Sequence, residues 1–242
     1  MGRGLVWLVL TLAVWQFPFA HANTREQINV ASEHWPDYTQ SDGQGLAWDI
    51  LRLVYGPLDI ELVVHSVPHT RAMGLAKRGE LDAFAGSYLY EVRKGIHYPE
   101  MYYDFDVVAA LGLKSSPVPE LETLKDYRLA WPRGYQYQRY LPATGIYREI
   151  SRSSNVLSML EMRHTDFFLD DLSELEHVLA EASDRSRYKV TPLIRLPVYV
   201  GFSDTPKGKR LADVFDQRMK VLIADGSLRP VFKRWKQMYP FD

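Results

Sequence analysis

The stretch AMGLAKRGELDAFAGSYLYEVRK, residues 72–94, places a helix pattern and a strand pattern in close succession. Apolar residues recur at helical spacing from Ala72 to Ala76, and Gly79 is a residue that commonly ends a helix. The run LDAFAG that follows is short and apolar, and it predicts a buried strand that ends near Gly86. This succession of helix and strand is typical of an α/β fold.

The same alternation continues on both sides of this stretch. Before it, INVAS and IELVV predict strands, and LAWDILRLVYGP predicts a helix that Gly56 and Pro57 end. Beyond the Pro-containing segment PVPELETL the alternation restarts with YRLAWP and TDFFLDD, and two helical patterns close the chain. The sequence therefore predicts parallel sheets covered by helices, arranged as two α/β lobes with a cleft between them.

Composition and the first residues narrow the class of protein. The 242 residues are 46% hydrophobic and carry a net charge of −1 with dispersed basic residues, so neither nucleic acid nor an anionic membrane is an expected partner. Arg3, a following apolar run and AHA at 20–22 predict a cleaved signal peptide over residues 1–22 and a periplasmic location. The absence of cysteine excludes a lipid-anchoring cysteine, disulfides and a thiol nucleophile.

Two candidate binding residues follow predicted strands, where ligands of open α/β sheets collect. Arg93 follows the strand that ends near Gly86 and could bind a carboxylate, or it could be an ordinary surface arginine. Asp170 and Asp171 end the strand TDFFLDD, and because neighbouring side chains on a strand point to opposite faces, only one can face a given cleft. The alternative role for this pair is to cap the next helix.

Other motifs are weaker. Trp35 and Tyr38 follow the first strand and could stack on a ligand or fill the core. His69 stands at the start of a predicted helix, where it could contact a ligand, pack in the core or cap the helix. His65 and His69 form a close pair with no evident third ligand, so no metal site is expected. The sequence contains no P-loop, no dinucleotide fingerprint and no nucleophile elbow, and it predicts no cofactor.

Six segments, taken in order, resemble the type 3 extracellular solute-binding proteins, the periplasmic receptors of polar amino-acid ABC transporters. The segments are GLAWDILRLV, AMGLAKRGELDAFAGSYLYEVRK, PEMYYDFDVVAAL, LETLKDYRLAWPRGYQYQ, MLEMRHTDFFLDD and ADGSLRPVFKRW. The resemblance implies a type II two-lobe fold whose two crossings fall near residues 105–110 and 196–200. It divides the chain into a signal peptide (1–22), the first lobe (23–107), the second lobe (108–197) and a return to the first lobe (198–242).

The resemblance also implies a site for an amino-acid-like solute. Arg93 would grip the α-carboxylate and Asp171 would take the α-ammonium group, while Trp35 and His69 would pack against the ligand side chain. Asp171 then displaces Asp170 as the acid of the cleft.

The chain departs from the family pattern near the expected carboxylate site. Gly86 keeps the strand-end position, but Tyr88 stands where the family has a small hydroxyl donor, and Tyr135 and Gln136 replace the small residues that follow Gly134 in the second lobe. These departures suggest that the ligand is not a standard amino acid.

The resemblance implies a monomeric binding protein that delivers its solute to an ABC transporter permease. The alternatives are a secreted enzyme on the same scaffold, similar to cyclohexadienyl dehydratases, with Glu33 or Asp170 as the catalytic acid, and a ligand-sensing protein that feeds a signalling receptor.

Overall fold

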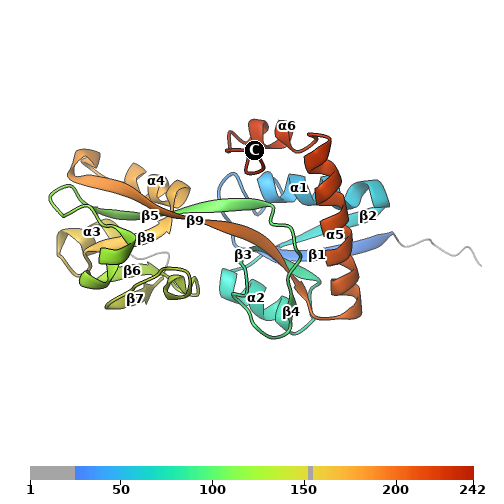
Figure 1. Cartoon of the computed structure of the whole chain (residues 1–242), viewed down its shortest axis with the longest axis horizontal. Coiled ribbons are helices and arrows are strands. Elements are labelled where there is room, and N and C mark those ends of the chain that lie inside the picture. The colour runs from blue at the N-terminus through green and yellow to red at the C-terminus, as the bar shows by residue number, and fades with distance from the viewer. Residues whose placement is uncertain (1–24, 152–154) are drawn as a thin grey trace, which may run out of the picture.

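Two long strands organise the molecule, which we describe from a computed structural model for residues 25–151 and 155–242. Strands β5 (Asp104–Leu113) and β9 (Tyr188–Ser203) pair antiparallel and run from one half of the molecule to the other (Figure 1). The sheet has the order β2-β1-β3-β9-β5-β8-β6-β7, with β4 paired to β9. The crossings expected near residues 105–110 and 196–200 fall on these two strands, and the finer lobe boundaries stay a prediction.

The first half carries the alternation predicted from the sequence. Strand β1 pairs in parallel with both β2 and β3, and helices connect them. The elements are β1 (Glu26–Ser32), α1 (Leu46–Tyr55), the 3₁₀ turn η1 (Gly56–Leu58), β2 (Ile60–Ser66), α2 (His69–Lys77), β3 (Ala83–Tyr88) and β4 (Ile96–His97). Helix α1 buries Leu46, Ile50 and Val54 on one face and ends at Gly56, where Pro57 follows.

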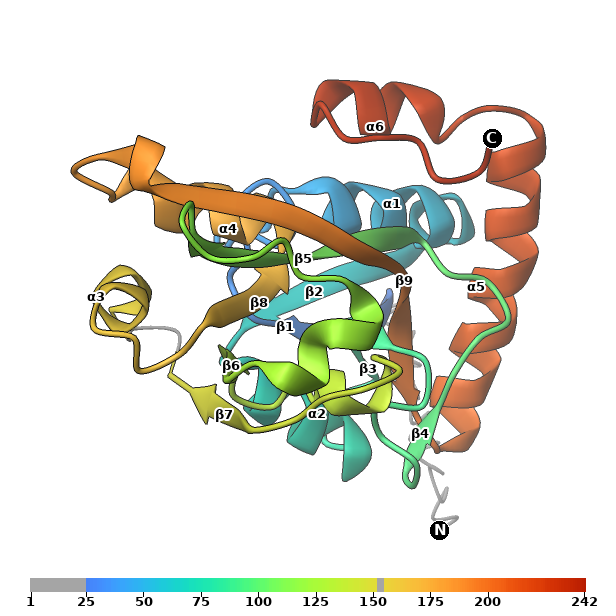
Figure 2. The same ribbon diagram turned by 60° about the vertical axis from the view of Figure 1, so that its left-hand side comes forward.

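The second half repeats the pattern. Strand β6 pairs in parallel with β7 and β8, and β8 pairs antiparallel with β5. The elements are η2 (Leu121–Asp126), β6 (Leu129–Pro132), η3 (Tyr137–Arg139), β7 (Tyr147–Ile150), α3 (Val156–Glu161), β8 (Phe167–Asp171), α4 (Leu172–Ala180) and η4 (Arg185–Arg187). Figure 2 shows these strands beside the long pair that links the halves.

The chain then returns to the first half. Helices α5 (Pro206–Ala224) and α6 (Arg229–Arg234) pack beside α1 (Figures 1 and 2). Three clusters of buried apolar residues form the core, and the first of them contains residues of both halves, such as Phe215 and Trp131. Apolar packing therefore joins the two halves, in addition to the two long strands.

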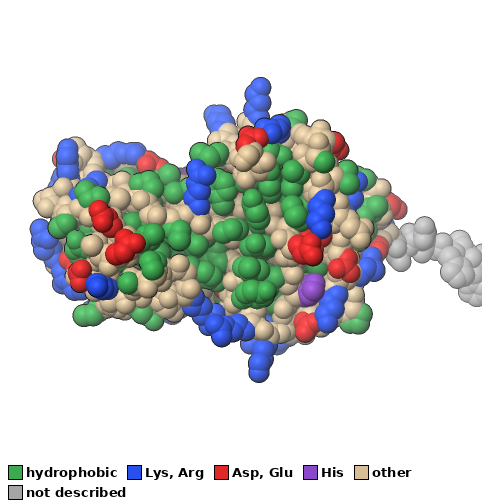
Figure 3. All heavy atoms as spheres, viewed as in Figure 1, with side chains coloured by type: hydrophobic (Ala, Val, Ile, Leu, Met, Phe, Trp, Pro, Cys, Tyr) green, Lys and Arg blue, Asp and Glu red, His purple; other side chains and the backbone are tan. Residues whose placement is uncertain are grey.

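The distribution of basic side chains and the length of the helices can be compared with what the sequence predicted. Lys and Arg side chains are scattered over the face in Figure 3 rather than gathered in one patch, as the dispersed charges of the sequence indicated. In the described part of the chain, no helix has the length and apolar character needed to cross a membrane. The predicted signal peptide lies outside the described residues.

Candidate functional site

A pocket lies where the two halves meet around the long strands. Most of its lining residues come from the loop after β1, from β3, from the start of β5, from the loop after β6, from the end of β8 and from the first turn of α4. The lining residues are Trp35, Tyr38, Gly86, Tyr103, Asp104, Asp106, Tyr135, Asp170, Asp171, Ser173, Glu174 and Val198. The free volume is about 40 Å³, which leaves room for a few water molecules.

The strand pairing explains why acids gather here. Strands β5 and β8 are antiparallel with Val108 opposite Asp171, so the start of β5 lies beside the end of β8. Asp104 and Asp106 are two positions apart on β5, and side chains two apart on a strand share a face. The carboxylates of two strands therefore converge on one pocket.

Trp35 forms one wall of the pocket and is held by Gly86 and Tyr135. A Cβ atom at Gly86 would lie 2.3 Å from the Trp35 ring, and Gly86 has φ of +82°, so glycine is required at this position. The Trp35 indole Nε1 donates a hydrogen bond of 3.1 Å to the Tyr135 hydroxyl in the other half. The structure thus brings together three residues that the sequence analysis singled out.

Asp171 lines the pocket and also caps helix α4, the alternative role for this pair of acids; its role in binding stays a prediction. One carboxylate oxygen accepts a 2.8 Å bond from the Ser173 backbone N–H, and the other accepts a 3.0 Å bond from the Val107 N–H. Asp170, which the resemblance had set aside, lines the same pocket and is 2% exposed. Both acids therefore line one pocket, contrary to the expectation that only one of them could face it.

The sequence analysis did not identify Asp104 and Asp106. Asp104 is 5% exposed, and its Oδ1 accepts a 2.8 Å bond from the Phe105 N–H. Burial raises the pKa of Asp104 to about 7, the bond from Phe105 opposes this rise, and the charge of Asp171 adds to it. The pattern YYDFD, with acids two apart at the start of an apolar strand, was the signal that could have revealed them.

Asp106 lies beside the tyrosines of the pocket floor. Its Oδ2 accepts a 2.6 Å bond from the Tyr88 hydroxyl. Burial and the charge of Asp171 raise the pKa of Asp106 well above its usual value, although the bond from Tyr88 works against this. The pKa of Tyr38 is also raised, first by burial and then by the charges of Asp104, Asp171 and Asp106.

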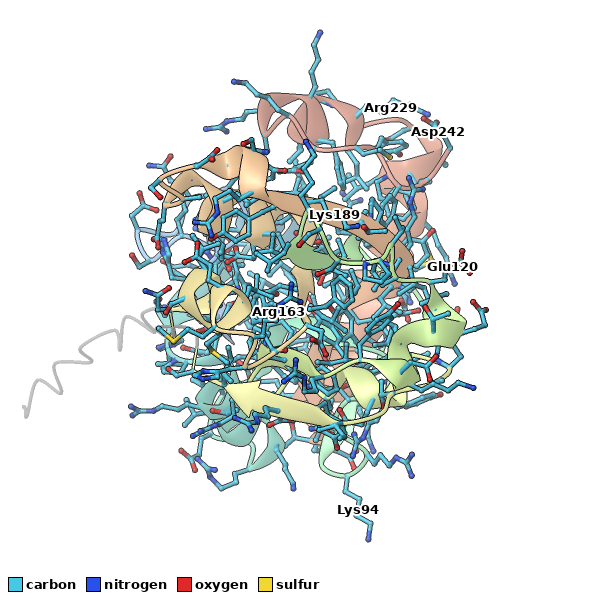
Figure 4. The ribbon with its side chains drawn as sticks, turned by 90° about the vertical axis from the view of Figure 1, so that its left-hand side faces the viewer. Lys94, Glu120, Arg163, Lys189, Arg229 and Asp242 are labelled. Atoms are coloured by element: carbon cyan, nitrogen blue, oxygen red, sulfur yellow. The ribbon has the colours of Figure 1, made fainter. Side chains whose placement is uncertain are left out.

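Arg93 lies on the surface and is not among the residues that line the pocket. The chain turns at Tyr90, which has φ of 58°, and the Glu91 N–H bonds to the Tyr88 carbonyl over 3.1 Å. This turn directs Glu91 inward, and the neighbouring Lys94 points away from the body in Figure 4. Because Arg93 is exposed and does not line the pocket, its role as a carboxylate clamp stays a prediction.

His69 and Glu91 form a buried layer behind the pocket wall. The His69 Nε2 lies 2.9 Å from one carboxylate oxygen of Glu91, and the Ser87 hydroxyl donates a 2.9 Å bond to the other. The His69 ring centroid is 5.7 Å from that of Trp35 and 5.4 Å from that of Tyr135. His69 therefore supports the aromatic wall and borders an adjoining hollow instead of the pocket itself.

The remaining predicted residues take supporting positions. Tyr88 is 4% exposed and reaches the pocket only through its bond to Asp106. Gln136 has φ of 50° and precedes η3, and it does not line the pocket. His65 bonds Asn29 over 3.0 Å, and within residues 25–151 and 155–242 no group of His, Asp and Glu side chains is arranged to hold a metal ion.

Comparisons with known proteins identify the fold. No protein-family model and no curated protein sequence matches the chain. Solved structures match over most of its length, including the substrate-binding protein of an amino acid ABC transporter, with 17% identity, a TM-score of 0.66 and coverage of 86% of this chain and 98% of that one. The chain therefore has the two-lobe α/β fold of periplasmic binding proteins, as predicted.

Two further neighbours show how varied proteins of this fold are. A histidine kinase sensor domain with similarity to periplasmic binding proteins shares 15% identity and a TM-score of 0.67, over 87% of this chain and 96% of that one. An ancestral amino acid-binding protein, described as a precursor of cyclohexadienyl dehydratase, shares 14% identity and a TM-score of 0.67, over 87% and 95%. Identities this low establish the fold alone.

Proposed function

We propose that this chain is a solute-binding protein that holds a small organic cation in the pocket between its lobes. The observation that carries the proposal is the pairing of carboxylates and aromatic rings in one pocket. Asp104, Asp106 and Asp171 line it beside Trp35 and Tyr38, and no described lining residue is Lys or Arg. A free carboxylate on the solute would find no cation there among the described residues.

The electrostatics of the pocket favour a positive group. Burial, and after it the negative charge of Asp171, raises the pKa values of Asp104 and Asp106, so the gathered carboxylates repel one another. A cation bound among them offsets this repulsion, and a cation over the face of Trp35 or Tyr38 gains up to about 2 kcal/mol when water is excluded. The same pocket would repel an anion.

Hinge motion between the lobes supplies the entry route in this proposal. The Trp35–Tyr135 bond of 3.1 Å and a 2.9 Å bond from the Arg139 side chain to the Glu91 carbonyl join the two lobes. With about 40 Å³ free, the pocket has to open before a solute can enter. Closure around the solute then marks the loaded protein for a membrane partner.

The proposed partner is an ABC transporter permease, with export to the periplasm directed by residues 1–22. A sensor role uses the same lobes, and a neighbouring structure belongs to a histidine kinase sensor domain. The genes beside this one separate the two roles, because a permease with an ATPase favours uptake and a histidine kinase favours sensing.

A dehydratase is the second candidate because one neighbour is described as a precursor of such an enzyme. The pKa of Asp104, raised to about 7, would suit a catalytic acid. Cyclohexadienyl substrates carry carboxylates, however, and the described pocket lining supplies no cation for them. We therefore favour binding, and product formation from prephenate or arogenate by the purified protein would reverse this choice.

Pairs of solutes that differ by one carboxylate test the proposal. Isothermal titration calorimetry compares cadaverine with lysine, agmatine with arginine, and choline with glycine betaine. We expect the carboxylate-free member of at least one pair to bind at least tenfold more tightly. Tighter binding of the carboxylate-bearing member throughout would contradict the proposal.

A charge-neutralising variant locates the binding to the pocket. Asp104→Asn, compared with the wild type at pH 8, removes a carboxylate that lines the pocket and should weaken cation binding by about 2 kcal/mol or more, the range for breaking one partner of a desolvated charge pair. Asp213→Asn makes the same change of charge at an exposed position of α5 and should leave the dissociation constant unchanged.

A further inference from the structure

A second hollow shares a wall with the pocket. It is lined by Tyr38, Asp104, Phe105, Val107, Asp171, Leu172, Ser173, Glu176, Lys236, Gln237 and Met238, and four of these residues also line the pocket. We call it the outer groove. Its free volume is about 310 Å³, against about 40 Å³ for the pocket. The two spaces therefore adjoin along this wall, and most of the room lies in the outer groove.

Asp104 stands at the boundary between the two spaces. Asp104 is only 5% exposed, and one of its carboxylate oxygens accepts a hydrogen bond from the Phe105 N–H. Among the described residues, no group donates a hydrogen bond to its other oxygen. Because Asp104 lines both spaces, a buried acceptor with spare capacity faces a solute that occupies either of them.

The other acids of the outer groove are already occupied. Asp171 accepts backbone bonds from Val107 and Ser173, and Glu176 pairs with Arg185. Among the described lining residues, Asp104 is thus the acid best placed to receive a new positive group. Five of the remaining side chains are apolar or aromatic, namely Tyr38, Phe105, Val107, Leu172 and Met238.

The C-terminal segment forms the outer wall of the groove and is held in place. The Trp235 Nε1 donates a 2.9 Å bond to Asp49, and the Phe241 ring stacks on Tyr102 with centroids 5.2 Å apart. Arg229 pairs with Asp242, and Figure 4 shows the two side by side beside α6. This wall is therefore a built part of the fold.

We infer that the solute is an elongated organic monocation, whose positive group lies at Asp104 and whose carbon chain extends along the outer groove to Met238. The inference rests on the proposed function and deepens it. The apolar lining suits a hydrocarbon chain, while Lys236, exposed at the outer end, disfavours a second positive group there.

A series of primary amines tests the inference by calorimetry. Ethylamine, butylamine and hexylamine share one ammonium group and differ in chain length. We expect affinity to increase with length by up to about fourfold for each methylene group, the value for full burial. We also expect hexylamine to bind more tightly than 1,6-diaminohexane, which carries a second positive group.

Filling the outer groove separates the chain from the ammonium group. Met238→Trp should abolish the gain from longer chains and leave the dissociation constant of ethylamine unchanged. Met162→Trp is the matched control, because Met162 is 64% exposed, Met238 is 60% exposed, and Met162 lines neither space. Asp104→Asn should weaken all three amines by the same factor.

The outcomes distinguish this inference from the proposed function. If ethylamine binds and hexylamine binds no more tightly, or if Met238→Trp leaves hexylamine binding intact, the elongated solute is wrong and the cation site stands. If no cation of any length binds, and the carboxylate-bearing solutes do, the proposed function itself is wrong.

Discussion

Replacing Asp104 with Asn should stabilise the ligand-free protein above neutral pH. The carboxyl has a pKa of about 7 in the folded chain and about 4 when unfolded. Below pH 4 both states hold the proton and Asp104 contributes nothing to the pH dependence. Between pH 4 and 7 the unfolded chain releases the proton while the folded chain keeps it, so stability falls as pH rises and then levels off. The difference of about 3 pKa units corresponds to about 4 kcal/mol.

Urea unfolding of the two proteins at pH 4.5, 6 and 8 measures this effect. Asn has nearly the shape of the protonated acid, so the wild type and Asp104→Asn should be of similar stability at pH 4.5. The variant should be more stable by several kcal/mol at pH 8, and the gap should open between these values. Asp213→Asn, at an exposed site on α5, controls for the change in net charge. A gap that does not change with pH would refute the reasoning.

Three more predictions concern binding. Affinity for a cation should increase as pH rises through about 7, because Asp104 loses its proton there, and the Asp104→Asn variant should show a smaller slope in calorimetric titrations. Gly86→Ala should displace the Trp35 ring and lower cation affinity at least tenfold, with a shift in tryptophan fluorescence, since the new Cβ would lie 2.3 Å from that ring. Arg93→Ala should leave the dissociation constants of amines unchanged, and a tenfold loss would restore Arg93 to the site.

The fold could be predicted from the sequence because burial imposes a period on it. Helix α1 shows the apolar spacing of Leu46, Ile50 and Val54 and lies where the pattern placed it. Gly56 and Pro57 end it by local backbone chemistry that tertiary contacts do not alter. Element boundaries were less accurate, since β3 extends to Tyr88, beyond the expected end.

The binding pocket could be predicted only in part. Strand-end reasoning identified Gly86 and Asp171, which line the pocket. It considered carboxyl ends alone and so missed Asp104 and Asp106, which stand at the amino end of β5. That end reaches the pocket because β5 runs antiparallel to β8, and pairing of strands distant in sequence leaves no local signal.

The orientation of the Arg93 side chain depends on a turn that no sequence motif predicts. Tyr90 adopts a left-handed conformation with φ of 58°, which is uncommon for an aromatic residue, and no glycine marks the position. In the structure, Glu91, which follows this turn, is buried and Arg93 is exposed. Such a choice is set by tertiary contacts, here the bonds of the Glu91 carboxylate to His69 and Ser87.

The start of β5 supplies much of the negative charge of the pocket, and the loop after β3 places a further acid behind the pocket wall. Glu91 takes the inward position behind the pocket wall, where its carboxylate is bonded to His69 and Ser87. Asp104 and Asp106 add negative charge from the other side, at positions where β5 exposes alternate side chains without any change in its pairing. Because backbone hydrogen bonds hold the two long strands together, side chains at these few positions can set the charge of the pocket without any change in the fold.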